Sequence, residues 1–259
     1  MKAIRFIHIF FYVSIPIFSL VLMGMSIRYQ KKKLCQNVKI RIENEADNLF
    51  LDVEKIKRVI ASEENLMETP VRAISLTSVE NKLIATNFVD HAEAYFSPRG
   101  NLNLDVELRQ PIARVVTSKN ESFYIDKNLL KMPLNPHFAA RSILVRGNFK
   151  EKYYSLFVQD SILQTVLPLL SYIDSHPLVK SQISELVVNR DGEILIYPEI
   201  GSLKIEFGSV ENFQQKFDHL LLFYKEVLSK TGWSYYSKVN LKYKNQVVAV
   251  KAKNSQTEN

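Results

Sequence analysis

The stretch GNLNLDVELRQPIA, residues 100–113, contains the pattern of a strand and, after it, the signal of a domain boundary. Apolar residues alternate with polar ones, and this period of two predicts a half-buried strand. The apolar face of the strand consists of Leu102, Leu104, Val106 and Leu108. Pro111 follows, and proline is poorly accepted inside a central strand. We therefore expect one domain to end at residue 110 and another to begin at residue 111.

Residues 38–110 are predicted to form a small α+β domain with the order β-α-α-β-β. Strands are indicated by alternation, and helices by apolar residues three and four positions apart. The predicted elements are strand 38–42, helices 51–61 and 76–86, and strands 92–96 and 102–108, with a turn at 97–100. Asp52 is expected to cap the first helix, and Thr77 or Ser78 the second.

Residues 111–251 are predicted to form a second α+β domain, with an antiparallel sheet and helices on one face. The predicted elements are strands 112–117, 122–125, 186–189, 193–196, 202–207, 238–243 and 246–251, and helices 158–173 and 210–228. Asp191-Gly192 indicates a tight hairpin, since both central turn positions tolerate positive φ. Pro168 is expected to kink its helix, and Gly232 follows the end of the other. Residues 252–259 are expected to be a disordered tail.

The amino-terminal region carries nearly all of the net charge of +7. Residues 1–36 contain six basic and no acidic residues, whereas the remainder holds 28 basic and 27 acidic residues. Residues 6–27 are uncharged and apolar, and 22 residues rising about 1.5 Å each span a bilayer core of about 30 Å. We expect a transmembrane helix at 6–27 between a cytoplasmic tail, 1–5, and a juxtamembrane stretch, 28–37.

Two alternatives concern this segment. A cleaved signal peptide is disfavoured because its apolar region is usually shorter, about 7–15 residues. The positive charges after residue 27 exceed those before residue 6, and the positive-inside rule alone would keep the remainder in the cytoplasm.

The near-neutral remainder of the chain also supplies no basic field of the kind that binds nucleic acid.

The chain shows no signature of an enzyme. Its five histidines lie more than thirty residues apart, and the single cysteine, Cys35, cannot form an internal disulfide. No usual metal-ligand spacing results, and the glycines form no phosphate-binding loop. Neither a cofactor, a metal nor a small-molecule substrate is therefore expected.

Two short motifs resemble catalytic groups. Asp174-Ser175-His176 contains the residue types of a triad, but adjacent residues at a helix end rarely point at one another, so a helix cap is favoured. Asp126, after the apolar run 123–125, is expected to form a turn rather than to act as an acid.

The order of a membrane span, a β-α-α-β-β domain and a second domain ending in strands resembles the bacterial cell-division family FtsQ/DivIB. The span and the first domain resemble its membrane anchor and POTRA-type domain. The stretches that resemble family segments are 87–94, 100–113, 122–126 and 239–243.

This resemblance implies a non-enzymatic inner-membrane scaffold of the divisome, with most of the chain in the periplasm at the division septum. It implies binding of FtsB- and FtsL-like single-span proteins at the last strand, linking them to septal peptidoglycan synthesis. A terminal strand at a sheet edge offers unpaired backbone groups to a partner. The expected partner-binding residues are Tyr243, Gln246, Val247, Val248, Ala249, Val250 and Lys251.

Other hypotheses remain open on the sequence alone. The last strand would be structural if it lay inside the sheet. An anchored envelope enzyme, such as a peptidoglycan hydrolase, and a POTRA-containing protein of outer-membrane assembly or transport are the alternative functions.

Overall fold

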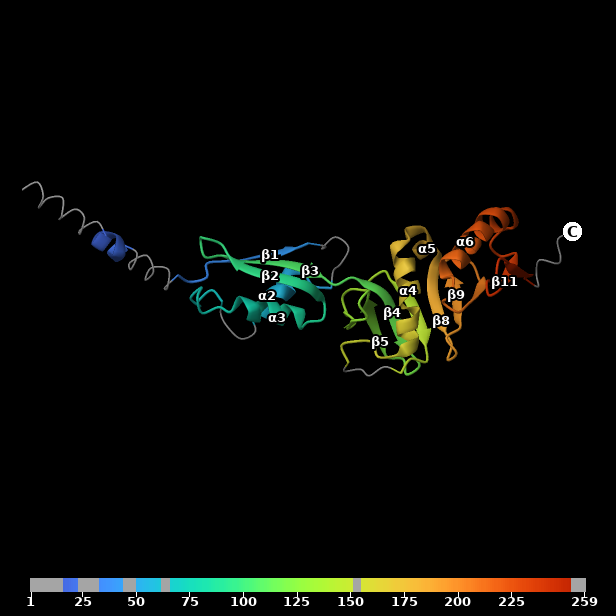
Figure 1. Cartoon of the computed structure of the whole chain (residues 1–259), viewed down its shortest axis with the longest axis horizontal. Helices are drawn as coiled ribbons and strands as arrows, with labels where there is room; N and C mark the ends of the chain where they lie inside the picture. The colour runs from blue at the N-terminus through green and yellow to red at the C-terminus, as the bar shows by residue number, and fades with distance from the viewer. Residues whose placement is uncertain (1–15, 23–32, 44–49, 62–65, 151–154, 253–259) are drawn as a thin grey trace, which may run out of the picture. The chain divides into compact units, whose positions relative to one another are not determined.

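The computed structural model describes residues 16–22, 33–43, 50–61, 66–150 and 155–252 (Figure 1). The chain divides into two compact units, residues 1–108 and 109–259. The predicted transmembrane segment 6–27 lies largely outside the described residues, as do the tail 1–5 and residues 28–32 and 253–259. Residues 16–22 form a helix. Within the described ranges, no helix combines the length and the apolarity needed to cross a bilayer.

The first unit has the predicted β-α-α-β-β order. Its elements are β1 (Val38–Ile42), α2 (Val53–Ala61), α3 (Leu76–Ile84), β2 (Val89–Phe96) and β3 (Leu102–Leu108). The sheet order is β1-β3-β2, with β1 parallel and β2 antiparallel to β3. The inward face of β3 is buried and packs with apolar residues of both helices.

The helix caps of this unit agree with one prediction and correct another. Asp52 accepts a hydrogen bond from Lys55 N at 2.7 Å and so caps α2 as expected. Ser75 caps α3, because its hydroxyl accepts from Ser78 N at 3.3 Å. The predicted caps, Thr77 and Ser78, were wrong because both already lie inside the first turn.

The second unit contains one nine-stranded sheet. Its strands are β4 (Pro111–Thr117), β5 (Ser122–Asp126), β6 (Lys131–Met132), β7 (Ile143–Gly147), β8 (Ile183–Val188), β9 (Ile194–Pro198), β10 (Lys204–Gly208), β11 (Tyr236–Asn240) and β12 (Val248–Lys251). The sheet order is β12-β11-β10-β9-β8-β7-β4-β5-β6. Its helical elements are α4 (Ser161–Ser175), α5 (Pro177–Gln182), α6 (Phe213–Phe223), the π-helical turn η2 (Tyr224–Leu228) and α7 (Ser229–Thr231).

The prediction of an antiparallel sheet was wrong, because the sheet is mixed. β7 is parallel to both β4 and β8, and β10 is parallel to β11. Parallel neighbours need a crossover connection; α4 with α5 joins β7 to β8, and α6 with η2 joins β10 to β11. The sequence prediction lacked β7, so the first of these crossovers was not visible.

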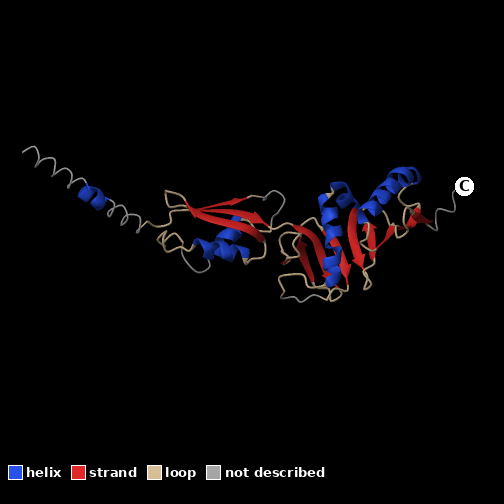
Figure 2. Ribbon diagram, viewed as in Figure 1, coloured by secondary structure: helices blue, strands red, loops and turns tan. Residues whose placement is uncertain are grey.

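The helices lie on one face of this sheet, as predicted (Figure 2). β7, β8 and β10 run in the same direction, and both crossovers advance toward β12. Because crossovers are almost always right-handed, two that share strand direction and advance must place their helices on the same face. The resulting core contains apolar residues of α4, α5, α6 and η2 against one face of the strands.

The loop between β8 and β9 differs in detail from the predicted hairpin turn. Gly192 has a φ of 77°, whereas Asp191 does not have a positive φ. Asn189 N donates to Glu193 O at 2.9 Å, and Gly192 N donates to Asn189 O at 3.1 Å. The antiparallel pairing of the two strands is confirmed, but the loop has three residues with glycine at the left-handed position.

Candidate functional site: the β12 edge

β12 is the last strand in the order of the second sheet. It pairs antiparallel with β11, in the register Lys238 to Val250, Val239 to Ala249 and Asn240 to Val248. On its other side no strand of the described chain pairs with it. The last strand therefore lies at an edge of the sheet, not in its interior.

The backbone groups of β12 divide between the neighbouring strand and the outside. Ala252 N donates to Tyr235 O at 2.9 Å, so this amide points toward β11. Amides two residues apart point to the same side in an extended strand. The backbone amides of Val250 and Val248 therefore also point toward β11. The N–H and C=O groups of Ala249 and the N–H of Lys251 then point outward, where an added strand would bind them, whereas the Lys251 C=O accepts from Ser237 of β11.

The side chains of this edge separate onto two faces. Val247 and Ala249 pack against the core beneath the helices. Val248 and Val250 lie on the opposite face and are 42% and 47% exposed. The edge therefore offers two β-branched apolar side chains beside its outward backbone groups, a combination suited to strand addition.

The turn before β12 contains Tyr243 and Gln246, which are two more of the predicted partner residues. Gln246 N donates to Tyr243 O at 3.3 Å, and Asn245 in this turn has a φ of 59°. Gln246 and Val247 precede the strand, which begins at Val248 instead of residue 246 because the turn extends further than predicted. Tyr243 is 57% exposed, so its ring is accessible to a partner just before the edge strand begins.

Lys251 lies at the far end of the edge beside Tyr235. Its Nζ is 5.1 Å from the centroid of the Tyr235 ring. A hydrogen bond with the Tyr235 phenol raises the pKa of Lys251 above its usual value, so the ammonium form is favoured at this end. The aromatic neighbour was not predicted, although the pair Tyr235-Tyr236 at the start of β11 was a visible signal.

Ser237 is a second residue of this region that the sequence analysis missed. Its hydroxyl donates toward the carbonyls of Val250, at 3.3 Å, and Lys251, at 3.4 Å. A lone serine in a strand carries no sequence signal for such a contact, which depends on the bulge between Tyr236 and Lys238.

The other sheet edges are covered or charged. Next to β6, Lys131 N donates to Leu156 O at 2.8 Å, so an extended segment covers that edge. On β2, Ala94 N donates to the Glu80 carboxylate at 2.8 Å. β1 presents exposed Lys39 and Arg41. Charges and covering segments are the usual means of preventing strand addition. Within the described part of the chain no strand pairs with the outer side of β12, and Lys251 at its end is its one charged residue.

Neither motif that resembles a catalytic group forms an active site. Asp126 Oδ1 accepts hydrogen bonds from Asn128 N and Leu130 N, each at 2.8 Å, which confirms its predicted role in a turn. Its Oδ2 lies 2.6 Å from Arg109 Nη1 in a buried ion pair.

In the second motif, the three side chains do not form a relay. Asp174 pairs with Lys180 at 2.6 Å, not with His176. His176 Nδ1 lies 2.7 Å from Tyr172 O and 3.1 Å from Ser175 Oγ, at the junction of α4 and α5. The described part of the chain also contains no cluster of three His, Cys, Asp or Glu residues that would hold a metal ion.

Comparison with protein families gives two matches. A model described as FtsQ/DivIB, C-terminal related, matches residues 110–250, and a model of the POTRA-like domain matches residues 33–107. The first covers more than half of the chain, and the second covers the unit with the β-α-α-β-β order. No curated protein matches the chain.

Proposed function

The chain belongs to the FtsQ/DivIB family, and on this premise we propose that it is a scaffold that binds other division proteins by strand addition at β12. The family is generally non-enzymatic, and its domains point to a role in the divisome. The observation that carries the proposal is the edge of β12, which pairs with no further strand among the described residues and has outward backbone groups at Ala249 and Lys251 and exposed Val248 and Val250.

The proposed partners are FtsB- and FtsL-like single-span proteins, whose capture would link this chain to septal peptidoglycan synthesis. A partner strand would hydrogen-bond to the outward groups, while its side chains would pack beside Val248 and Val250. Main-chain bonds give such complexes affinity, and the alternating side chains give them specificity.

The proposed location is the inner membrane at the division septum, with residues 6–27 as the anchor and residues 28–259 in the periplasm. The apolar run of 22 uncharged residues supports the anchor. Protease treatment of spheroplasts tests the orientation: the two folded units should be digested when protease is added outside. Protection of these units in spheroplasts, with digestion only after lysis, would refute it.

Strand addition is tested by removing one outward donor at a time. Lys251→Pro and Ala249→Pro each delete an outward N–H, and proline is tolerated at the exposed side of an edge strand. Lys251→Ala is the matched control, because it removes the ammonium and keeps the amide. The affinity-tagged full-length chain is purified from gently solubilised membranes, and the co-eluting proteins are identified and quantified.

We expect both proline variants to lose capture of the single-span partners by about tenfold or more, since a hydrogen bond is lost and the ring blocks close approach. The alanine control should retain capture. Fluorescence of Trp233, the single tryptophan, reports whether the second unit stays folded. Full capture by both folded proline variants would refute strand addition at β12.

The absence of catalysis is tested separately. The purified full-length chain is incubated with peptidoglycan, and release of soluble fragments is measured. We expect no release above that of a heat-denatured sample. Turnover that persists through purification would favour the envelope-enzyme alternative.

A further inference from the structure

A pocket lies in the second unit, away from the β12 edge. It encloses about 390 Å³, within the range of roughly 300–1,000 Å³ typical of small-ligand sites. Its walls come from the segment entering β7, from α5, from the start of β8 and from the residue after β9. None of these segments contributes to the β12 edge.

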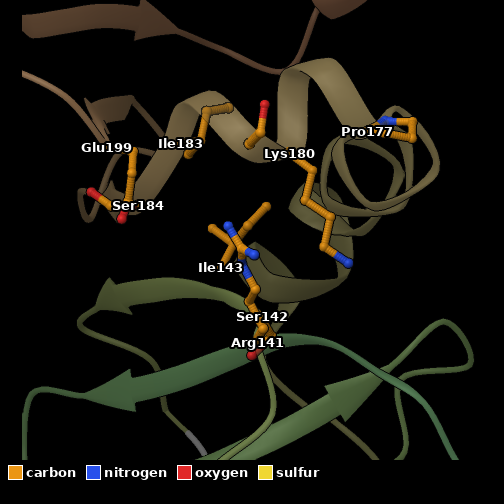
Figure 3. Close-up of a pocket in the computed structure, with 9 residues that line it drawn as sticks. Arg141, Ser142, Ile143, Pro177, Lys180, Ile183, Ser184 and Glu199 are labelled. Carbon is orange, nitrogen blue, oxygen red and sulfur yellow. The ribbon is translucent and has the colours of Figure 1, made fainter. Parts of the chain in front are cut away.

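Opposite charges line this pocket without neutralising one another. Arg141 and Glu199 both face it, and neither forms an ion pair or a side-chain hydrogen bond with any described residue. Figure 3 shows the Arg141 guanidinium extending into the hollow, with Glu199 and Ser184 on one wall and Lys180 on the other. An unpaired guanidinium and an unpaired carboxylate thus border the same space.

Apart from the Ser142 hydroxyl, which is buried without a hydrogen-bond partner among the described residues, the remaining lining groups are already engaged or apolar. Lys180 Nζ is held by Asp174 at 2.6 Å. The Ser184 hydroxyl donates to Tyr197 O at 3.2 Å. Ile143, Ile183 and Pro177 supply apolar surface. The free polar groups of the lining are therefore the charged ends of Arg141 and Glu199, together with the Ser142 hydroxyl.

We propose that this pocket binds a small zwitterion of the amino-acid or short-peptide class. A carboxylate accepts two parallel hydrogen bonds from a guanidinium, which is the favoured geometry for arginine. An ammonium group is the matching partner for Glu199. A ligand that carries both charges pairs the two side chains at once, and a methyl-sized side chain would lie against the isoleucines.

Calorimetric titration of the full-length chain in mild detergent tests this site. The probes are alanyl-alanine in its L,L and D,D forms, N-acetyl-alanyl-alanine without the cation, and alanyl-alanine amide without the anion. We expect one or both zwitterionic stereoisomers to bind with a Kd of about 1 mM or tighter, and each blocked analogue about tenfold more weakly. Absence of binding by both zwitterions, or equal binding of all four probes, would overturn the proposal.

Two variants assign the charges. Arg141→Met should weaken the zwitterion about tenfold and abolish the preference over the amide, while Glu199→Gln should abolish the preference over the N-acetyl form. Arg190→Met, in the loop between β8 and β9, and Glu121→Gln, before β5, are controls outside the pocket. Loss of affinity with both preferences intact would indicate only a structural effect and would overturn the assignment.

Discussion

The ion pair between Arg109 and Asp126 should be the most sensitive charged contact of the second unit. The two side chains are only 8% and 3% exposed, and Nη1 and Oδ2 are 2.6 Å apart. Asp126→Asn removes the charge but keeps an oxygen that can accept from the amides of residues 128 and 130. The variant therefore removes the charge that Asp126 supplies to a buried guanidinium, and removing one partner of a buried ion pair costs about 3–5 kcal/mol.

That cost is large against the roughly 5–15 kcal/mol that stabilises a typical domain. The double variant Arg109→Met with Asp126→Asn removes both charges and leaves no uncompensated one. We expect it to be about 2–3 kcal/mol more stable than Asp126→Asn alone, because the coupling between contacting residues is not additive. The single variant Arg109→Met completes the double-mutant cycle. In this variant the Asp126 carboxylate keeps the hydrogen bonds from its two backbone donors.

The assay is equilibrium unfolding in urea, followed by the fluorescence of Trp233. This residue is the single tryptophan, and its ring centroid lies 5.1 Å from that of Tyr224 in the same unit. With a slope of roughly 2 kcal/mol per molar urea, Asp126→Asn should lower the midpoint by about 2 M. A loss below about 1 kcal/mol, or a double variant no more stable than the Asn single variant, would refute the reasoning.

Three further predictions follow from single contacts. Glu80→Ala frees Ala94 N–H on the β2 edge, so we expect a loss of about 1–3 kcal/mol and self-association in analytical ultracentrifugation; a stable monomer would contradict the capping role. Burial raises the pKa of Tyr224 above its ordinary value of 10.0, so this phenol ionises in the unfolded state before it ionises in the folded one. The contribution of Tyr224 to stability is therefore lost as pH rises above about 10. In urea unfolding across this range, the free energy of unfolding should decline less steeply with pH for Tyr224→Phe than for the unaltered chain. Gly208 has a φ of 80°, and an added Cβ would lie 3.0 Å from Lys242 Cγ; Gly208→Ala should cost about 1 kcal/mol or more in thermal unfolding, and an unchanged melting temperature would contradict this.

Alternation and helical spacing predicted most elements because the residues that make them amphipathic are close in sequence. The β-α-α-β-β order of the first unit and the helix at 213–223 follow directly from such patterns. The strand β7 was missed because ILVRG, residues 143–147, is only five residues long and begins with three apolar residues in a row, which gives no clear alternation. The short helix α5 was missed for a similar reason, since six residues give too little periodicity.

The candidate site was predicted in part. The sequence indicated an apolar, β-branched terminal strand at residues 246–251, and the structure places β12 at an edge, where strand addition is geometrically open. The sequence did not distinguish the amides of Val248 and Val250, which point to β11, from those of Ala249 and Lys251, which point outward. That division depends on the register with β11 and on the bulge after Tyr236.

The sequence by itself determined the β-α-α-β-β order of the first unit, the amphipathic faces and the turn at Gly100, because these depend on local conformation and on the burial of nearby apolar groups. The tertiary structure decided the mixed sheet, the edge position of β12 and the Arg109–Asp126 pair. These features join segments distant in the chain, and strand order and ion pairing arise from how the elements pack. Local propensity does not contain that information.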